Sequence, residues 1–425
     1  MAARPGQRPV LLWAAESSRL VLGFAVFAVL ARLAGAEALG VYLSVVSLAT
    51  LAPRLLDLGL PLAVGYFLRL KPDGLRACSR LLARHTVLAL PAAMVLAASM
   101  IWFPFEGTAA TALARSHWPQ IAVLIVAELV MLLGLAAFIP TTRYKAYFGT
   151  TLLAPALMLL GLGLLRLVRP AHAPDAGDLL DLLTAATAIS SVFMIVAVRR
   201  ASRQGGRQPF DARAVYRYGL RTYSSAVAKI LAQRFDRLYL PTVLVSASYA
   251  QYSLAISIRD MVTFPANLYA LTLRNRQIDL IGHRHDIPGA RRLLARVSAI
   301  WTLAGLGLAV ALMPAWSTLV TIGFGAQFEH TSHFVRILVF SCAPMAVMSF
   351  AWNHLNALNR PGRVTILTTV SLLLALPVYV LFIRFAGPSN GVAFATVAWS
   401  AASAAASLAW ALVSVPPTDP TPTTP

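Results

Sequence analysis

The chain has 425 residues, of which 58% are hydrophobic and only 12% are charged, and its formal net charge is +20. Soluble globular domains carry roughly 25% charged residues, so this composition excludes an ordinary soluble domain. The positive charge is almost entirely arginine and lies mostly between apolar runs, which favours a membrane-topology signal over a nucleic-acid-binding surface.

Apolar runs of about 20 residues or more recur along the chain, and each is long enough to cross a hydrocarbon core of about 30 Å. Because backbone polar groups must be paired inside lipid, we expect an all-α polytopic membrane protein. No small-residue cleavage site follows the first run, so it is expected to be a retained helix. The predicted spans are 10–33, 39–65, 82–103, 118–139, 146–167, 179–198, 216–243, 247–272, 293–319, 334–355, 366–385 and 392–413.

The segments that connect these spans alternate in charge. One set is basic and the other contains acidic residues with few basic ones, which predicts an even number of spans with both termini in the cytoplasm. The basic set contains Arg4, Arg8, Arg69, Lys71, Arg76, Arg80, Arg143, Lys145, Arg199, Arg200, Arg203, Arg207, Arg213, Arg274, Arg276, Arg284, Arg291, Arg292, Arg360 and Arg363. The acidic set contains Glu37, Glu106, Asp175, Asp178 and Glu329.

The spans divide six and six about a basic segment. We therefore predict an N-terminal six-helix bundle at 1–200, a cytoplasmic basic linker at 201–215, a C-terminal six-helix bundle at 216–414 and a disordered Pro/Thr-rich tail at 415–425. Segments 36–44 and 246–254 are alike in small residues and in the position of a tyrosine, which is a weak sign of internal duplication. Transporters are often built from such repeats, with the substrate site at the interface between them.

Ionisable residues inside the predicted spans are the strongest functional signal, because burying a charge in lipid is costly. In the first half, Glu16 and Arg19 are three residues apart, as are Arg54 and Asp57, so each pair is predicted to share a helix face. Arg19 lies about 13 Å from the start of its span at 1.5 Å per residue, close to the middle of the membrane. Glu128 is the one acidic residue of the fourth predicted span.

In the second half, the seventh span is the most polar. Lys229 and Asp236 belong to a stripe with Ser225 and Gln233 at steps of three and four residues. Arg234 and Arg237 flank this stripe, and Arg259 lies beside Asp260 in the eighth span. These charges therefore fall in the first, second, seventh and eighth spans, which are the same positions in each half.

Two interpretations of these charges remain open. Single pairs could be compensated and structural, whereas the set as a whole favours a functional role. The surplus of cations indicates an anionic substrate such as a phosphate or pyrophosphate group, which arginine binds bidentately. The carboxylates Asp236, Asp57 and Glu16 are candidates for coupling transport to a proton or a sodium ion.

Motifs for other functions are missing from the sequence. It contains no P-loop, no HExxH, no GxSxG and no clustered metal ligands, and Cys78 and Cys342 are far apart. We expect no enzymatic activity and no cofactor beyond a coupling ion.

Several short segments resemble bacterial polysaccharide flippases of the multidrug/oligosaccharidyl-lipid/polysaccharide exporter superfamily. LAGAEALGVY at 33–42 and LDLGL at 56–60 look like the first two helices of that family. IGFGAQF at 322–328 with VRIL at 335–338 is similar to its loop between helices nine and ten. NALNR at 356–360 resembles the end of its helix ten, and RFDR at 234–237 is similar in character to its helix seven.

The resemblance implies two six-helix bundles around a central cavity that opens alternately to each side of a bacterial inner membrane. The implied substrate is an undecaprenyl-pyrophosphate-linked oligosaccharide, and implied partners are membrane lipid, a polysaccharide polymerase and export machinery. Because helices one and seven line the cavity in that family, the resemblance assigns substrate-facing roles to Arg19 and Lys229, and by extension to Arg54, Arg237 and Arg259. The short linker and the pairing of Glu16 with Arg19 depart from the family pattern and leave ion coupling open.

Other functions remain as alternatives. Within the superfamily they are a lipid II flippase and a drug or cation antiporter, although an antiporter would favour an acidic cavity. A membrane enzyme such as a polysaccharide polymerase is an alternative from a different functional class. Such an enzyme would ordinarily carry a large catalytic loop outside the membrane. A membrane scaffold is a third class, and it would leave the buried charges without a role.

Overall fold

The computed structural model describes residues 8–70, 74–100, 108–141, 143–170, 172–203, 211–283, 285–358 and 360–414. The regular structure of these residues is helical throughout, which confirms the predicted all-α class. The predicted tail at 415–425 and residues 204–210 of the predicted linker lie outside the described residues.

Backbone contacts divide the chain into two compact units. Unit 1 comprises Met1–Tyr223 and Val245–Ala250, and unit 2 comprises Ser224–Leu244 and Gln251–Pro425. The division therefore falls inside helix α9 (Ala212–Tyr239), beyond the end of the basic segment at 201–215.

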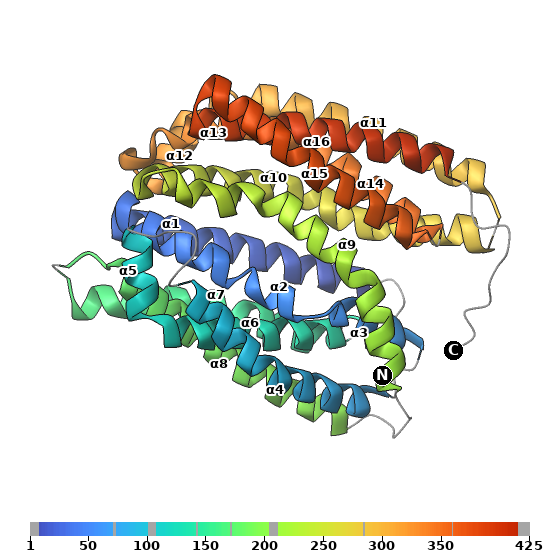
Figure 1. Cartoon of the computed structure of the whole chain (residues 1–425), viewed down its shortest axis with the longest axis horizontal. Coiled ribbons are helices and arrows are strands. Elements are labelled where there is room, and N and C mark those ends of the chain that lie inside the picture. Colours follow the sequence, from blue (N-terminus) through green and yellow to red (C-terminus); the bar gives the residue numbers. More distant parts are fainter. Residues whose placement is uncertain are drawn as a thin grey trace. The chain divides into compact units, whose positions relative to one another are not determined.

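The helices of unit 1, coloured blue to green in Figure 1, pack alongside one another. Its core is apolar and includes the buried side chains of Leu68, Leu82, Leu129 and Phe138. Alanines among the core residues allow helix backbones to approach closely, as is common in membrane bundles. The helices before α9 are α1 (Arg8–Ala49), α2 (Ala52–Leu56), α3 (Leu60–Leu70), α4 (Leu75–Ser99), α5 (Ala109–Ser116), α6 (Trp118–Phe138), α7 (Tyr144–Val168) and α8 (Ala176–Arg203).

Unit 2 begins within α9 and is linked internally by buried side-chain hydrogen bonds. The hydroxyls of Ser371 and Ser403 are 2.6 Å apart, and those of Tyr379 and Thr396 are 2.9 Å apart. These polar contacts join the last two helices of the chain in an apolar setting. The following elements are η2 (Leu240–Thr242), α10 (Ser246–Ile278), η3 (Asp279–His283), α11 (Ile287–Ala311), α12 (Trp316–Phe324), η4 (Ala326–Phe328), α13 (Thr331–Leu338), η5 (Val339–Ser341), α14 (Cys342–Ala357), α15 (Pro361–Ala386) and α16 (Pro388–Val413).

Among the described residues, nine helices are long and apolar enough to cross a membrane, and the chain is a multi-pass membrane protein. The number is lower than the twelve predicted spans for physical reasons. Trp13–Leu56 counts once although Gly35, with φ 79° and ψ 170°, breaks α1 where the first and second predicted spans meet. Helices α9 and α10 coincide with the seventh and eighth predicted spans but carry too much polar sequence to qualify on hydropathy alone.

Close packing follows the break in α1. A Cβ atom on Gly40 would lie 1.8 Å from the backbone oxygen of Ser246, at the start of α10, so only glycine fits at this contact. Nearby, the hydroxyls of Ser47 and Tyr249 are 2.8 Å apart. The segment 36–44 therefore meets residues 246–250, the part of the similar segment that belongs to unit 1, at the contact of Gly40 with Ser246.

The second predicted span is interrupted between α2 and α3. Leu58 and Gly59 adopt positive φ values of 49° and 72°, and the Asp57 carboxylate accepts a hydrogen bond of 2.7 Å from the Gly59 backbone N–H. A Cβ atom on Gly59 would lie 2.2 Å from the backbone oxygen of Gly219 on α9. Asp57 and Gly59 thus form a turn that packs closely against α9 within unit 1.

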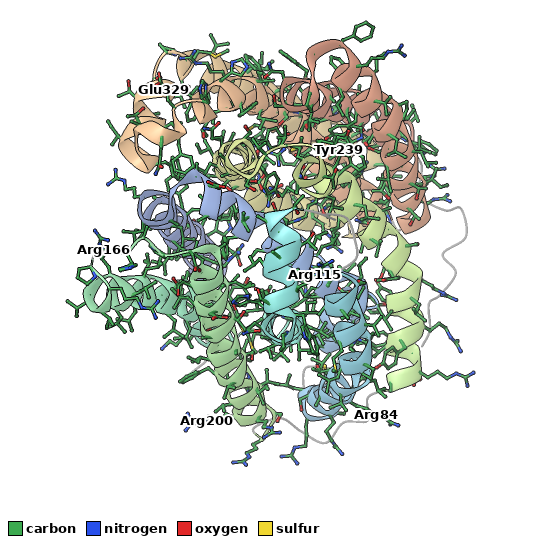
Figure 2. All side chains as sticks on the ribbon, turned by 60° about the vertical axis from the view of Figure 1, so that its left-hand side comes forward. Arg84, Arg115, Arg166, Arg200, Tyr239 and Glu329 are labelled. Carbon is green, nitrogen blue, oxygen red and sulfur yellow. The ribbon has the colours of Figure 1, made fainter. Side chains whose placement is uncertain are left out.

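Basic side chains collect at one end of unit 1. Figure 2 shows Arg84 of α4 and Arg200 of α8 at the same end, whereas Arg166, near the end of α7, lies away from them. Arg76 of α4 links α4 to α8 at this end of unit 1. Its guanidinium donates to the backbone oxygens of Ser202 and Arg203 at 3.3 and 3.2 Å. Arg76 and Arg200 belong to the basic set predicted from the sequence, and Arg84 lies close to that set in the chain.

Candidate functional site

The candidate residues of the first helix form a local group in unit 1. The guanidinium of Arg19 donates to the Glu16 carboxylate at 3.0 Å, and 50% of the Arg19 side chain is exposed. The Tyr147 hydroxyl of α7 donates to the other oxygen of Glu16. Glu16 therefore has both oxygens engaged, one by a cation on its own helix and one by a distant helix.

Arg54 and Asp57 have the same spacing in sequence but do not form an ion pair within 4.0 Å in the described chain. The reason is local: Asp57 is where α2 ends, and its carboxylate turns back to the Gly59 N–H. The Arg54 side chain is exposed, and the nearby charges that act on it are Asp57, Glu128 and Arg19. The structure thus places Arg54 and Asp57 near one another, with Asp57 serving the turn.

Lys229 lies in unit 2, in the middle of α9. Its Nζ atom is 5.0 Å from the centroid of the Trp352 ring, a cation–π contact. Trp352 is 4% exposed, and its indole N–H donates to the Ser407 hydroxyl at 3.2 Å. Among the described residues no carboxylate lies within 4.0 Å of Lys229, so an aromatic face and not a counter-ion holds this ammonium.

Asp236, Arg237 and Arg259 come together with a fourth residue, Asp260. The Asp260 carboxylate accepts from Arg259 Nε at 3.1 Å and Nη2 at 2.7 Å, and its other oxygen accepts from Arg237 Nη2 at 2.7 Å. Asp236 Oδ2 lies 4.0 Å from Arg259 Nη1. The two cations assigned to substrate by resemblance are therefore compensated by two carboxylates in this state.

Asp236 itself is enclosed. It is 2% exposed, its Oδ1 accepts the backbone N–H of Arg237 at 2.7 Å, and its Oδ2 accepts from the Tyr252 hydroxyl at 3.4 Å. A buried carboxylate beside a guanidinium is poorly suited to a sodium ion, which needs several oxygen ligands and is repelled by the cation. Its surroundings are those of a structural counter-charge.

Three residues that contact the candidate residues are not predicted as their partners from the sequence: Tyr147, Trp352 and Asp260. The first two contact their partners across 131 and 123 residues, so no helical spacing could reveal them. Asp260 is adjacent to Arg259 in sequence, and that adjacency is the available signal. Within the described residues there is no group of three metal-ligating side chains, and both cysteines are buried and unpaired.

Comparisons with known proteins show which solved structures share this fold. No family model matches the sequence, and no curated protein matches it. Solved structures do match: "Lipid II flippase MurJ, inward closed conformation" has 13% identity and a TM-score of 0.69, covering 96% of this chain and 88% of its own. An inward-facing MATE family multidrug resistance transporter of the MOP superfamily has 13% identity and a TM-score of 0.66. The match covers 92% of this chain and 93% of that transporter.

A third solved structure is a MOP superfamily transporter from Pyrococcus furiosus, described as having a binding pocket of reverse polarity. It has 13% identity and a TM-score of 0.61, and the match covers 95% of this chain and 94% of that one. Similarity at this level of identity concerns the fold. The chain has the fold shared by the MATE and MurJ transporters.

Proposed function

We propose that this protein is a flippase that moves an undecaprenyl-pyrophosphate-linked oligosaccharide across the membrane by alternating access. The fold supports the mechanism, because solved MATE transporters with this fold include inward-facing and outward-facing conformations. The MurJ neighbour, named a lipid II flippase, supports a lipid-linked substrate. The saccharide and the polyprenyl carrier are inferred from the resemblances in sequence.

The observation that supports the anionic substrate most directly is the state of Lys229. Its ammonium has no carboxylate partner within 4.0 Å in the described chain and lies against Trp352. A cation–π contact leaves the positive charge available, whereas an ion pair would neutralise it. Such an ammonium in a membrane helix is suited to a phosphate oxygen arriving with the substrate.

Cations in unit 1 support the same class of ligand. Arg19 is half-exposed although it is paired with Glu16, and Arg54 is exposed without an ion pair within 4.0 Å in the described chain. We assign both to binding the pyrophosphate group, since arginine offers several N–H donors in a planar arrangement.

For the coupling ion we propose a proton on Glu16. A proton could be exchanged between this carboxylate and water while Tyr147 and Arg19 keep the side chain in place. Asp57 is committed to its turn and Asp236 to its buried contacts, so neither is our choice among the three candidate carboxylates.

The same proposal places the protein in a bacterial inner membrane with both termini in the cytoplasm, working beside a polysaccharide polymerase and export machinery. Deleting the gene should then cause lipid-linked repeat units to accumulate on the cytoplasmic leaflet. Accumulation on the outer leaflet would indicate a polymerase instead.

A reconstituted system tests the activity itself. Purified protein in liposomes receives a fluorescent undecaprenyl-pyrophosphate disaccharide, and a membrane-impermeant quencher reports the leaflet it occupies. We expect wild-type protein to move the probe, Arg19→Ala and Lys229→Ala each to abolish movement, and Arg166→Ala, which removes one exposed positive charge elsewhere, to leave it intact. Full activity of the Arg19→Ala/Lys229→Ala double variant would refute the role proposed for these two cations.

The same liposomes separate the alternatives. Movement of lipid II in preference to the disaccharide probe would favour a lipid II flippase. Uptake of a cationic dye with no movement of either lipid would favour a drug or cation antiporter.

A further inference from the structure

Two arginines on neighbouring helices converge on one carboxylate. Arg237 extends from α9 and Arg259 from α10, and together they give three hydrogen bonds of 2.7 to 3.1 Å to the two oxygens of Asp260. Each oxygen of the carboxylate thus faces a different guanidinium. Phosphate oxygens are bound by paired arginines through the same donors.

The two sides of this contact differ in exposure. The side chain of Arg259 is 5% exposed and that of Arg237 is 19% exposed, whereas that of Asp260 is 48% exposed. The carboxylate therefore lies on the open side and the guanidinium groups lie behind it. A small rotation of the Asp260 side chain would uncover donors that are already oriented.

The two carboxylates of the group are also held differently. Asp236 is buried and accepts from a backbone N–H and from the Tyr252 hydroxyl in addition to its proximity to Arg259. Asp260 has Arg237 and Arg259 as its hydrogen-bonding partners in the described chain. Asp236 is thus a fixed counter-charge, and Asp260 is the exchangeable one.

The charges favour exchange for a more highly charged anion. Arg234 also acts electrostatically on Asp260, so three cations act on this one carboxylate. If Asp260 turns away, the arginines retain Asp236 as their close counter-charge. An anion with two or more negative charges then gains more Coulomb energy from these arginines than a single carboxylate does.

We propose that Arg237 and Arg259 form a binding site for a phosphate or pyrophosphate group and that Asp260 occupies this site until such a group replaces it. This proposal rests on the proposed function, and it gives the pyrophosphate of the lipid-linked substrate a second binding position in addition to the one assigned to Arg19 and Arg54. Asp260 then acts as an internal competitor, which weakens binding and eases release.

Direct binding tests the site without requiring transport. Inorganic pyrophosphate is titrated into the full-length protein in detergent, and affinity is measured by calorimetry. Asp260→Asn should bind at least about tenfold more tightly than wild type, because one negative charge in contact with the site is removed. Asp260→Glu, which keeps the charge, should remain within about threefold of wild type.

Asp178→Asn is the matched control, because it removes one negative charge from an ion pair with Arg169 elsewhere in the chain. It should leave pyrophosphate affinity unchanged. If Asp260→Asn binds no more tightly than wild type, or if Asp178→Asn tightens binding equally, the competitor role is overturned.

Arg237→Gln provides a second test should Asp260→Asn fail to fold. It removes one of the two guanidinium groups and should lower pyrophosphate affinity at least about tenfold. Affinity equal to that of wild type would overturn the site. The liposome assay reports separately on the proposed function: wild-type flipping without these affinity changes would refute this site alone, and the affinity changes without flipping would refute the flippase alone.

Discussion

The ammonium of Lys229 lies over the ring of Trp352, 5.0 Å from its centroid, while the indole N–H of the same ring donates to Ser407. Trp352 is buried, so this hydrogen bond fixes the orientation of the ring. The lysine charge is therefore positioned by α14 and α16 although it belongs to α9.

We predict that Trp352→Leu lowers the flipping rate while Trp352→Phe retains most of it. A desolvated cation–π contact is worth roughly 2 kcal/mol, so removing the aromatic face should slow flipping by about tenfold or more. The initial rate in the liposome assay measures the effect. Equal rates for the leucine and phenylalanine variants would show that the ring does not position Lys229.

Glu16 gives a prediction about energy coupling. Glu16→Gln cannot ionise, so flipping should no longer respond to an imposed proton gradient, whereas Tyr147→Phe, which removes one hydrogen bond, should still respond. The measurement is the ratio of flipping rates with and without a pH difference across the liposome membrane. A gradient response that survives in Glu16→Gln would move the coupling role to another residue.

Asp57 distinguishes a structural carboxylate from an ion-coupling one. Asp57→Asn keeps an oxygen that can accept the Gly59 N–H, so we expect stability and flipping close to wild type. Asp57→Ala removes the acceptor and should lower stability by roughly 0.5–2 kcal/mol, the usual range for losing a comparable side-chain cap. Thermal unfolding in detergent measures this difference. Loss of flipping in a stable Asp57→Asn variant would instead support a role for its charge.

Gly40 tests the packing that follows the break in α1. Gly40→Ala places a methyl group against the Ser246 backbone oxygen and should destabilise the protein by roughly 1–3 kcal/mol, the usual range for overpacking. Gly23 lies on the same helix, and a Cβ atom added to it would meet no other atom within 4 Å. Gly23→Ala should therefore leave stability unchanged or raise it, by up to about 1 kcal/mol. Comparable melting temperatures for the two variants would contradict the close contact.

The helices can be predicted because apolar length is a property of the sequence itself. Residues 118–139 and 146–167 are predicted spans, and α6 and α7 begin and end within a few residues of them. The interruption of the span at 39–65 is not predictable in this way. It depends on the conformation of Leu58 and on the fit of Gly59 against Gly219, and neither alters the hydropathy of the segment.

The site shows the same limit. Spacing of three residues correctly places Glu16 beside Arg19, since both lie on one continuous helix. The same spacing misleads for Arg54 and Asp57, because the helix ends at Asp57 and the carboxylate turns to the backbone. The pairing of Arg237 with Asp260 joins two helices across 23 residues, so it follows from tertiary packing and not from periodicity.

The division of the chain within α9 has a mechanical consequence. Tyr223, whose hydroxyl donates to the Leu55 backbone oxygen at 2.5 Å, ends the part of α9 that belongs to unit 1, and Ser224 begins the part that belongs to unit 2. Backbone hydrogen bonds between residues four apart span this junction, so bending α9 there would require some of them to open. The two units are therefore joined here by a continuous helix and not by a loose connection, and Lys229 lies about one and a half turns beyond the junction.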